Sequence, residues 1–110
     1  MVLDGDLCRV AQLRANEIVT KLAHTRPDGT LCWTAYDELG VKSSYKAENI
    51  ACGTFTGAAT FNLWKEDGEK YDGQGHRRNM LSSSATKIGI AYTYVKDSDY
   101  KYYWVMELGK

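Results

Sequence analysis

The chain has 110 residues, which is the length of one domain with a single modest hydrophobic core. Its 14 basic and 14 acidic residues cancel, so there is no net positive field to hold nucleic acid or an anionic membrane surface. The hydrophobic fraction of 44% is that of an ordinary globular protein, and no apolar run is long enough to span a bilayer.

An amphipathic helix is predicted first along the chain, over residues 6–22. Asp4 or Asp6 can cap its start, and Pro27 with the Asp28-Gly29 pair breaks the chain after it. Its apolar residues recur at spacings of three and four, which is the helical period. They are Leu7, Val10, Ala11, Ala15, Ile18, Val19 and Leu22.

Short elements are predicted for the middle of the chain. Residues 34–39 are expected to form a short helix that Thr34 caps and Gly40 ends. Residues 47–51 are expected to be extended. Residues 68–75 hold three glycines and are expected to form a loop, and residues 76–81 one or two helical turns.

A second longer helix is expected to open at Thr54 or Thr56, both of which can cap a helix. Its inner face is predicted to carry Ala58, Phe61 and Trp64, which are the apolar side chains at helical spacing.

The C-terminal part of the chain predicts a β-hairpin. Residues 87–95 and 101–108 are rich in β-branched and aromatic side chains, and the sequence Lys-Asp-Ser-Asp between them is turn-like. Alternate residues of each strand share one face. These are Ile88, Ile90, Tyr92 and Tyr94 in the first strand, and Tyr102, Trp104, Met106 and Leu108 in the second. Helices followed by a hairpin that they cover indicate an α+β sandwich.

Three cysteines, Cys8, Cys32 and Cys52, are an odd number, and no C-x-x-C pair occurs among them. The spacing therefore argues against a zinc site made of thiolates. One disulfide with one free thiol, and three reduced thiols, both remain open. We expect at least one cysteine to be a buried free thiol that packs as a small apolar residue.

The chain has two histidines, and each lies beside turn residues that can aim its side chain into a cleft. His24 follows the first predicted helix. His76 has two glycines shortly before it and two arginines directly after it. Glu48 has apolar neighbours, which favours an inward-facing carboxylate. Two imidazoles with one or two carboxylates suit Zn²⁺ or a similar divalent ion. A His24 that only caps the first helix, and a Glu48 at the surface, are the simpler alternatives.

Five segments of the chain, taken in order, resemble the CAP superfamily and within it the bacterial SCP-like domains. They are RANEIVTKLAHTRPDGT, AENIA, GHRRNML, IGIAYTY and YYWVMEL. The resemblance as a whole covers nearly the entire chain, from about Leu7 to Leu108. Ala47 stands where the family motif has glycine, and the segment between Trp64 and His76 is longer than in many bacterial members. The family's usual first helix has no counterpart, so we expect a single domain over residues 1–110 that lacks this helix.

The resemblance implies a three-layer α-β-α sandwich with a central antiparallel sheet and a cleft lined by two histidines and two acids. By motif these are His24, His76 and Glu48, and the three would be the metal ligands. The second acid is expected about one helical turn after the helix tryptophan. This position is Asp67, with Glu66 and Glu69 as alternatives.

The same resemblance implies a secreted or cell-surface binding module, whose cleft takes a divalent cation such as zinc or a small ligand such as a lipid or sterol. A hydrolase that uses the histidine and acid cluster is the alternative, although the chain has neither a G-x-S-x-G elbow nor an H-E-x-x-H helix. The third possible function is structural, with a cluster that serves only as a buried hydrogen-bond network. A small ligand or a protein partner is expected rather than nucleic acid, and the oligomeric state is open.

Overall fold

The computed structural model describes residues 1–70 and 73–110. Residues 71 and 72, which belong to the loop expected over 68–75, lie outside the described part. The elements along the chain are β1 (Val2–Leu3), α1 (Gly5–Thr20), α2 (Thr34–Glu38), β2 (Ala47–Cys52), α3 (Gly57–Lys65), α4 (Gly75–Met80), β3 (Lys87–Tyr94) and β4 (Tyr102–Gly109). Among the described residues, no helix has the length and apolar character needed to cross a membrane.

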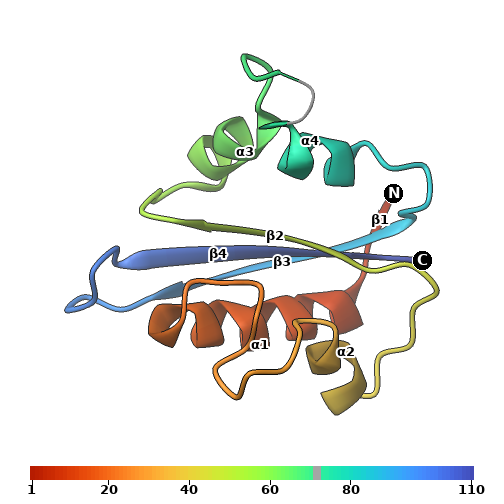
Figure 1. Ribbon diagram of the computed structural model, residues 1–110, viewed down its shortest axis with the longest axis horizontal. Coiled ribbons are helices and arrows are strands. Elements are labelled where there is room, and N and C mark those ends of the chain that lie inside the picture. The colour runs from red at the N-terminus through yellow and green to blue at the C-terminus, as the bar shows by residue number, and fades with distance from the viewer. Residues whose placement is uncertain (71–72) are drawn as a thin grey trace.

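The four strands form one sheet in the order β1-β3-β4-β2. β3 and β4 are antiparallel neighbours at its centre, β2 is antiparallel to β4 at one edge, and β1 runs parallel to β3 at the other. Figure 1 shows α1 and α2 on one face of this sheet and α3 and α4 on the other. The predicted α+β sandwich with the C-terminal hairpin at its centre is therefore confirmed.

Helix α1 packs its buried stripe against the sheet. Its N-cap is Asp4, whose carboxylate accepts a hydrogen bond from the backbone N–H of Leu7 at 3.2 Å. The helix lies so close to β3 that a Cβ on Gly89 would be 2.1 Å from the backbone carbon of Leu7, so this position requires glycine. The helix ends at Thr20, two residues earlier than predicted, and Leu22 is exposed rather than part of the stripe.

The inner face of α3 differs from the prediction. Trp64 is fully buried, as expected, and its indole N–H donates to the backbone oxygen of Ile50 at 3.0 Å. Phe61 is exposed and Thr60 is buried in its place, so the prediction for Phe61 and for the exposed Ala58 was wrong. Burial of Thr60 is possible because its hydroxyl is hydrogen-bonded to Thr56 and Thr54, which satisfies the polar group.

The start of α2 also differs from the prediction. The N-cap is Trp33, and the hydroxyl of Thr34 instead donates to the backbone oxygen of Leu31 at 2.8 Å. Gly40 follows the helix with φ of +70°, as a helix-ending glycine does. All three cysteines are free thiols in the structure, and Cys32 is buried, as expected for at least one of them.

Candidate functional site

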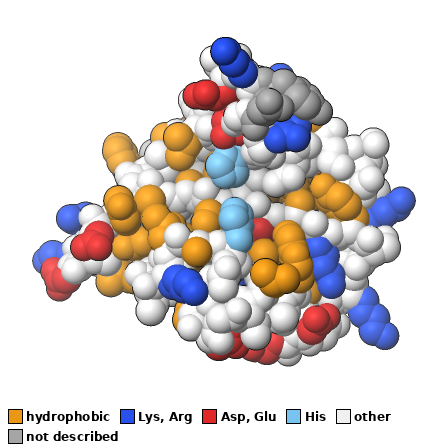
Figure 2. Space-filling model, viewed as in Figure 1, with side chains coloured by type: hydrophobic (Ala, Val, Ile, Leu, Met, Phe, Trp, Pro, Cys, Tyr) orange, Lys and Arg blue, Asp and Glu red, His pale blue; other side chains and the backbone are white. Residues whose placement is uncertain are grey.

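A cavity of about 440 Å³ opens beside the edge strand β2, between the two helix layers. Figure 2 shows the two histidines, drawn in pale blue, one above the other at the centre of this face. Three of the residues predicted for the cleft, His24, Glu48 and His76, line this one cavity. Among the described residues, the lining consists of His24, Glu48, Glu66, Gly73, Gly75, His76, Arg78 and Asn79.

The lower half of the cavity is built on Glu48, whose side chain is completely buried in β2. Its Oε1 lies 2.9 Å from Nδ1 of His24, which comes from the loop after α1. Arg14 reaches it from α1 and donates from Nε to Oε2 at 2.8 Å and from Nη2 to Oε1 at 3.1 Å. The carboxylate is thus held by a two-point guanidinium contact and presents one oxygen to the imidazole.

Arg14 also fixes the loop that carries His24. Its Nη2 donates to the backbone oxygen of Ala23 at 2.7 Å, and its Nη1 to Glu17 at 2.9 Å. The guanidinium is fully buried on the apolar stripe of α1. It was not predicted as a site residue, although a charged side chain among apolar positions of a helix was a signal that the sequence contained.

A second buried carboxyl lies beneath Glu48. Glu107 of β4 is its direct partner across the sheet, is fully buried, and has no hydrogen-bond donor for either oxygen among the described residues. Burial, and next the charge of Glu48, raise the pKa of Glu107 well above its usual range. Burial acts in the same direction on Glu48, but the hydrogen bonds with His24 and Arg14 and the charge of Arg14 outweigh it and lower the pKa of Glu48 to about 2. The arrangement therefore favours the protonated form of Glu107 and the ionised form of Glu48.

The upper half of the cavity is built on Glu66, which follows α3 with a left-handed φ of +49°. One of its oxygens lies 2.8 Å from Nδ1 of His76, and the other accepts from the backbone N–H groups of His76 at 2.9 Å and Arg77 at 3.2 Å. Burial would raise the pKa of Glu66, but the hydrogen bonds from His76 and Arg77 lower it.

The acid on the upper side is therefore Glu66 and not Asp67. The side chain of Asp67 is 65% exposed, pairs with Lys65 at 3.5 Å, and does not line the cavity. Glu69 does not line it either. The left-handed turn at Glu66 separates the directions of adjacent side chains, which a count of residues from Trp64 cannot reveal.

The amide of Asn49 joins the two halves. It is fully buried in β2, donates to the backbone oxygen of His76 at 3.1 Å, and accepts from the side chain of Asn79 at 2.9 Å. Since successive residues of a strand face opposite sides, Glu48 supports the lower histidine and Asn49 the helix of the upper one.

A group of side chains that could hold a metal ion is present. One potential ligand atom of each of His24, Cys32 and Glu48 lies within 4.8 Å of the others. This group, found among the described residues, does not include His76. Cys32 was not predicted as a ligand, because a lone cysteine outside a C-x-x-C pair gives no local signal. Burial, and then the charges of Glu48 and Glu107, raise the pKa of the Cys32 thiol to about 12.

Comparison with solved structures gives the same fold. An extracellular protein containing an SCP domain from Bacillus anthracis and an outer surface protein of Borrelia burgdorferi each match with a TM-score of 0.79 and 20% identity over 100% of this chain. A cysteine-rich secretory protein of Staphylococcus aureus matches with a TM-score of 0.67 and 17% identity, again over 100% of this chain. At these identities the likeness concerns the fold alone. The chain spans 33%, 77% and 32% of the three proteins, in the order given.

The sequence was compared with individual proteins and with family profiles. No individual curated protein matches it. The sequence profile of the cysteine-rich secretory protein family, CAP, matches residues 1–108, which is nearly the entire chain. The motifs around His24, Glu48 and His76 fall within this match. The chain therefore belongs to the CAP family of cysteine-rich secretory proteins.

Proposed function

We propose that this domain is a binding module that holds a divalent metal ion of the zinc type between Nε2 of His24 and Nε2 of His76. The observation that carries the proposal is the pairing of each Nδ1 with a carboxylate, at 2.9 Å for Glu48 and 2.8 Å for Glu66. In metal sites, histidine ligands commonly donate the second ring N–H to a carboxylate, which fixes the tautomer and the ring orientation. Neither Nε2 has a hydrogen bond among the described residues, so both remain available.

Glu48 supports this site from behind rather than as a ligand, which revises the ligand set expected from the sequence. Both of its oxygens already accept hydrogen bonds from Arg14, and one also contacts His24. A cation placed on the same oxygens would be repelled by the guanidinium. Two imidazoles then leave positions on the ion for water or for a bound molecule, as in open zinc sites.

The group of His24, Cys32 and Glu48 is the competing metal site. It would require loss of the Cys32 proton, whose pKa is about 12, and release of Glu48 from Arg14. Both changes oppose binding at neutral pH, although a metal ion lowers the pKa of a thiol that it binds. The histidine pair needs neither change and is the favoured site.

Calorimetry with Zn²⁺ on the wild type, His24→Ala, His76→Ala and Cys32→Ser tests the proposal. Each histidine variant is expected to weaken the affinity by at least about tenfold, since one of two protein ligands is lost. Cys32→Ser is expected to bind as the wild type does. Affinity should be lower in acid than at neutral pH, because protons compete with the metal ion for its ligand atoms.

Two results would contradict the histidine pair. One is equal affinity in His76→Ala and the wild type. The other is loss of binding in Cys32→Ser together with a thiolate charge-transfer band when Co²⁺ is added to the wild type, which would assign the ion to the buried group.

We also propose a secreted or cell-surface location. Support comes from the fold relatives in Bacillus and Borrelia, which are described as an extracellular and an outer surface protein. Accessibility of the domain to protease on intact cells is the expected result, and protection until the cells are lysed would contradict it.

A further inference from the structure

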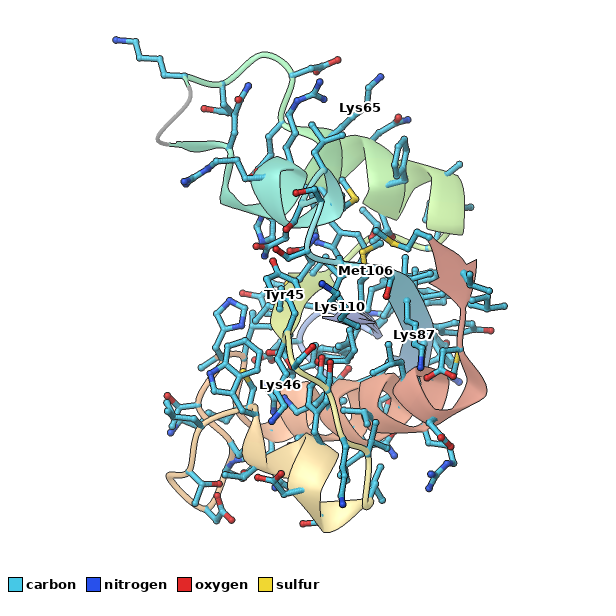
Figure 3. The ribbon with its side chains drawn as sticks, turned by 90° about the vertical axis from the view of Figure 1, so that its right-hand side faces the viewer. Tyr45, Lys46, Lys65, Lys87, Met106 and Lys110 are labelled. Atoms are coloured by element: carbon cyan, nitrogen blue, oxygen red, sulfur yellow. The ribbon has the colours of Figure 1, made fainter. Side chains whose placement is uncertain are left out.

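A second chamber of about 300 Å³ adjoins the histidine cavity and is not used by the metal proposal. It shares His24, Glu48 and Asn79 with that cavity, so the two form one elongated cleft. Its other walls come from the N-cap of α2, from the segment that leads into β2 and from the first residue of β2. These residues are Trp33, Tyr45, Lys46 and Ala47. Figure 3 shows Tyr45 between the helix layer that contains α4 and the layer that contains α1, and Lys46 below it at the level of α1.

The chamber has an aromatic wall, formed by Trp33 and Tyr45, in which the indole N–H of Trp33 is available to a ligand. Trp64 and Trp104 are buried, and their indole N–H groups donate to backbone oxygens at 3.0 and 2.7 Å. Trp33 differs from both, because it is only half-buried and its indole N–H has no acceptor among the described residues. Tyr45 is half-buried as well. Aromatic side chains with one apolar face and one polar group are frequent at binding surfaces.

Lys46 gives the chamber a positive charge that no acid of the described chain neutralises. Its ammonium lies 5.4 Å from the centre of the Tyr36 ring, and it forms no ion pair within residues 1–70 and 73–110. Among the described residues, the acid that lines the chamber is Glu48, and the charge of Glu48 is already matched by Arg14. An anion that enters the chamber therefore meets a lysine charge that is not paired with an acid of the described chain, and a Glu48 carboxylate that Arg14 already binds.

We propose that this chamber binds the carboxylate-bearing end of a small organic ligand with a planar or apolar body. Lys46 holds the carboxylate, and Trp33 and Tyr45 contact the body. The volume is at the lower end of the range for small-molecule sites. A single lysine matches the single charge of a carboxylate, whereas a phosphate dianion calls for more cations or for the planar fork of arginine. The proposal extends the binding role of the cleft but does not require the metal ion.

Titration with 3-phenylpropionate and with its uncharged amide, in the presence of a chelator, tests the proposal. The indole N–H signal of Trp33 in a ¹H–¹⁵N spectrum reports on binding. The acid is expected to bind on the order of tenfold more tightly than the amide, because a charge-assisted hydrogen bond is stronger than a neutral one. Lys46→Gln should remove this difference, whereas the exposed Lys42→Gln should keep it.

The controls separate this proposal from the metal site. His76 does not line the second chamber, so His76→Ala should keep the preference for the acid even when zinc binding is lost. Equal affinity for acid and amide would overturn the proposal, and so would an unchanged preference in a folded Lys46→Gln. Tighter binding of phenyl phosphate than of the carboxylate would overturn the ligand class.

Discussion

The two histidine–carboxylate pairs of the cleft have the same contact and different surroundings. Nδ1 lies 2.9 Å from Glu48 in one pair and 2.8 Å from Glu66 in the other. The side chain of Glu48 is 0% exposed and is held by the buried side chain of Arg14. The side chain of Glu66 is 15% exposed and is held by backbone N–H groups at the start of α4.

The difference shows two ways to orient an imidazole. On the lower side, an ion pair inside the core provides the orientation, and Glu48 cannot lose its partner without leaving a buried charge. On the upper side, the backbone supplies the donors close to solvent, so a substitution of Glu66 removes a contact without disturbing the core. We expect the lower pair to affect stability most and the upper pair to affect binding with little cost to the fold.

Replacement of Arg14 by methionine is the largest expected effect. It leaves Glu48 charged and buried, and loss of one partner from a buried ion pair costs about 3–5 kcal/mol. Urea unfolding measures this loss of free energy. Arg9→Met is the matched control on the same helix, because Arg9 is exposed and its pair with Asp6 contributes no more than about 1 kcal/mol. An Arg14→Met variant as stable as the control would show that Arg14 does not balance the charge of Glu48.

Replacement of Glu107 by glutamine tests whether Glu107 keeps its proton in the folded state. The raised pKa of Glu107 means that the folded state keeps a proton that the unfolded chain loses above about pH 4.5. Stability of the wild type should therefore fall as the pH rises above this value, by at most about 1.4 kcal/mol per pH unit. Glutamine cannot ionise, so urea unfolding of the variant between pH 5 and pH 8 should lack this slope.

The dependence of stability on pH below about 4.5 distinguishes the contribution of Glu48 from that of Glu107. Because the pKa of Glu48 is lowered to about 2, its contribution is complete above about pH 4.5 and is lost as the pH falls toward 2, in the wild type and in Glu107→Gln alike. Glu69→Gln, an exposed substitution, serves as the control. A wild type whose stability is constant from pH 5 to pH 8 would rule out the protonated Glu107.

Replacement of Glu66 by glutamine is the smallest expected effect. If the histidine pair binds zinc, loss of this supporting carboxylate should weaken the affinity by about 10- to 100-fold, as substitutions behind metal ligands do. Asp67→Asn is the matched control and should bind as the wild type does, since Asp67 does not line the cavity. Calorimetry of the two variants decides between the neighbouring acids. A loss in Asp67→Asn, with Glu66→Gln unaffected, would reverse the choice made from the structure.

The sequence by itself determined the elements that have a repeating pattern. Spacings of three and four placed α1, and alternation over residues 87–95 and 101–108 placed the central hairpin, because both periods follow from local backbone geometry. It also indicated His24, Glu48 and His76, since their motifs are short and continuous along the chain. The same reasoning failed for Phe61, where two neighbouring threonines satisfy Thr60 and allow it to be buried.

Only the tertiary structure decided what surrounds these three residues. Arg14 and Glu48 are 34 positions apart, and they meet because α1 packs on β3 and β4, and β2 is the neighbour of β4 in the sheet. Glu107 lies next to Glu48 through the register of β2 on β4, which sets two carboxyl groups side by side in the core. Cys32 approaches the same point from the loop before α2. Such contacts depend on how distant elements pack, and a single sequence read position by position carries no distance between them.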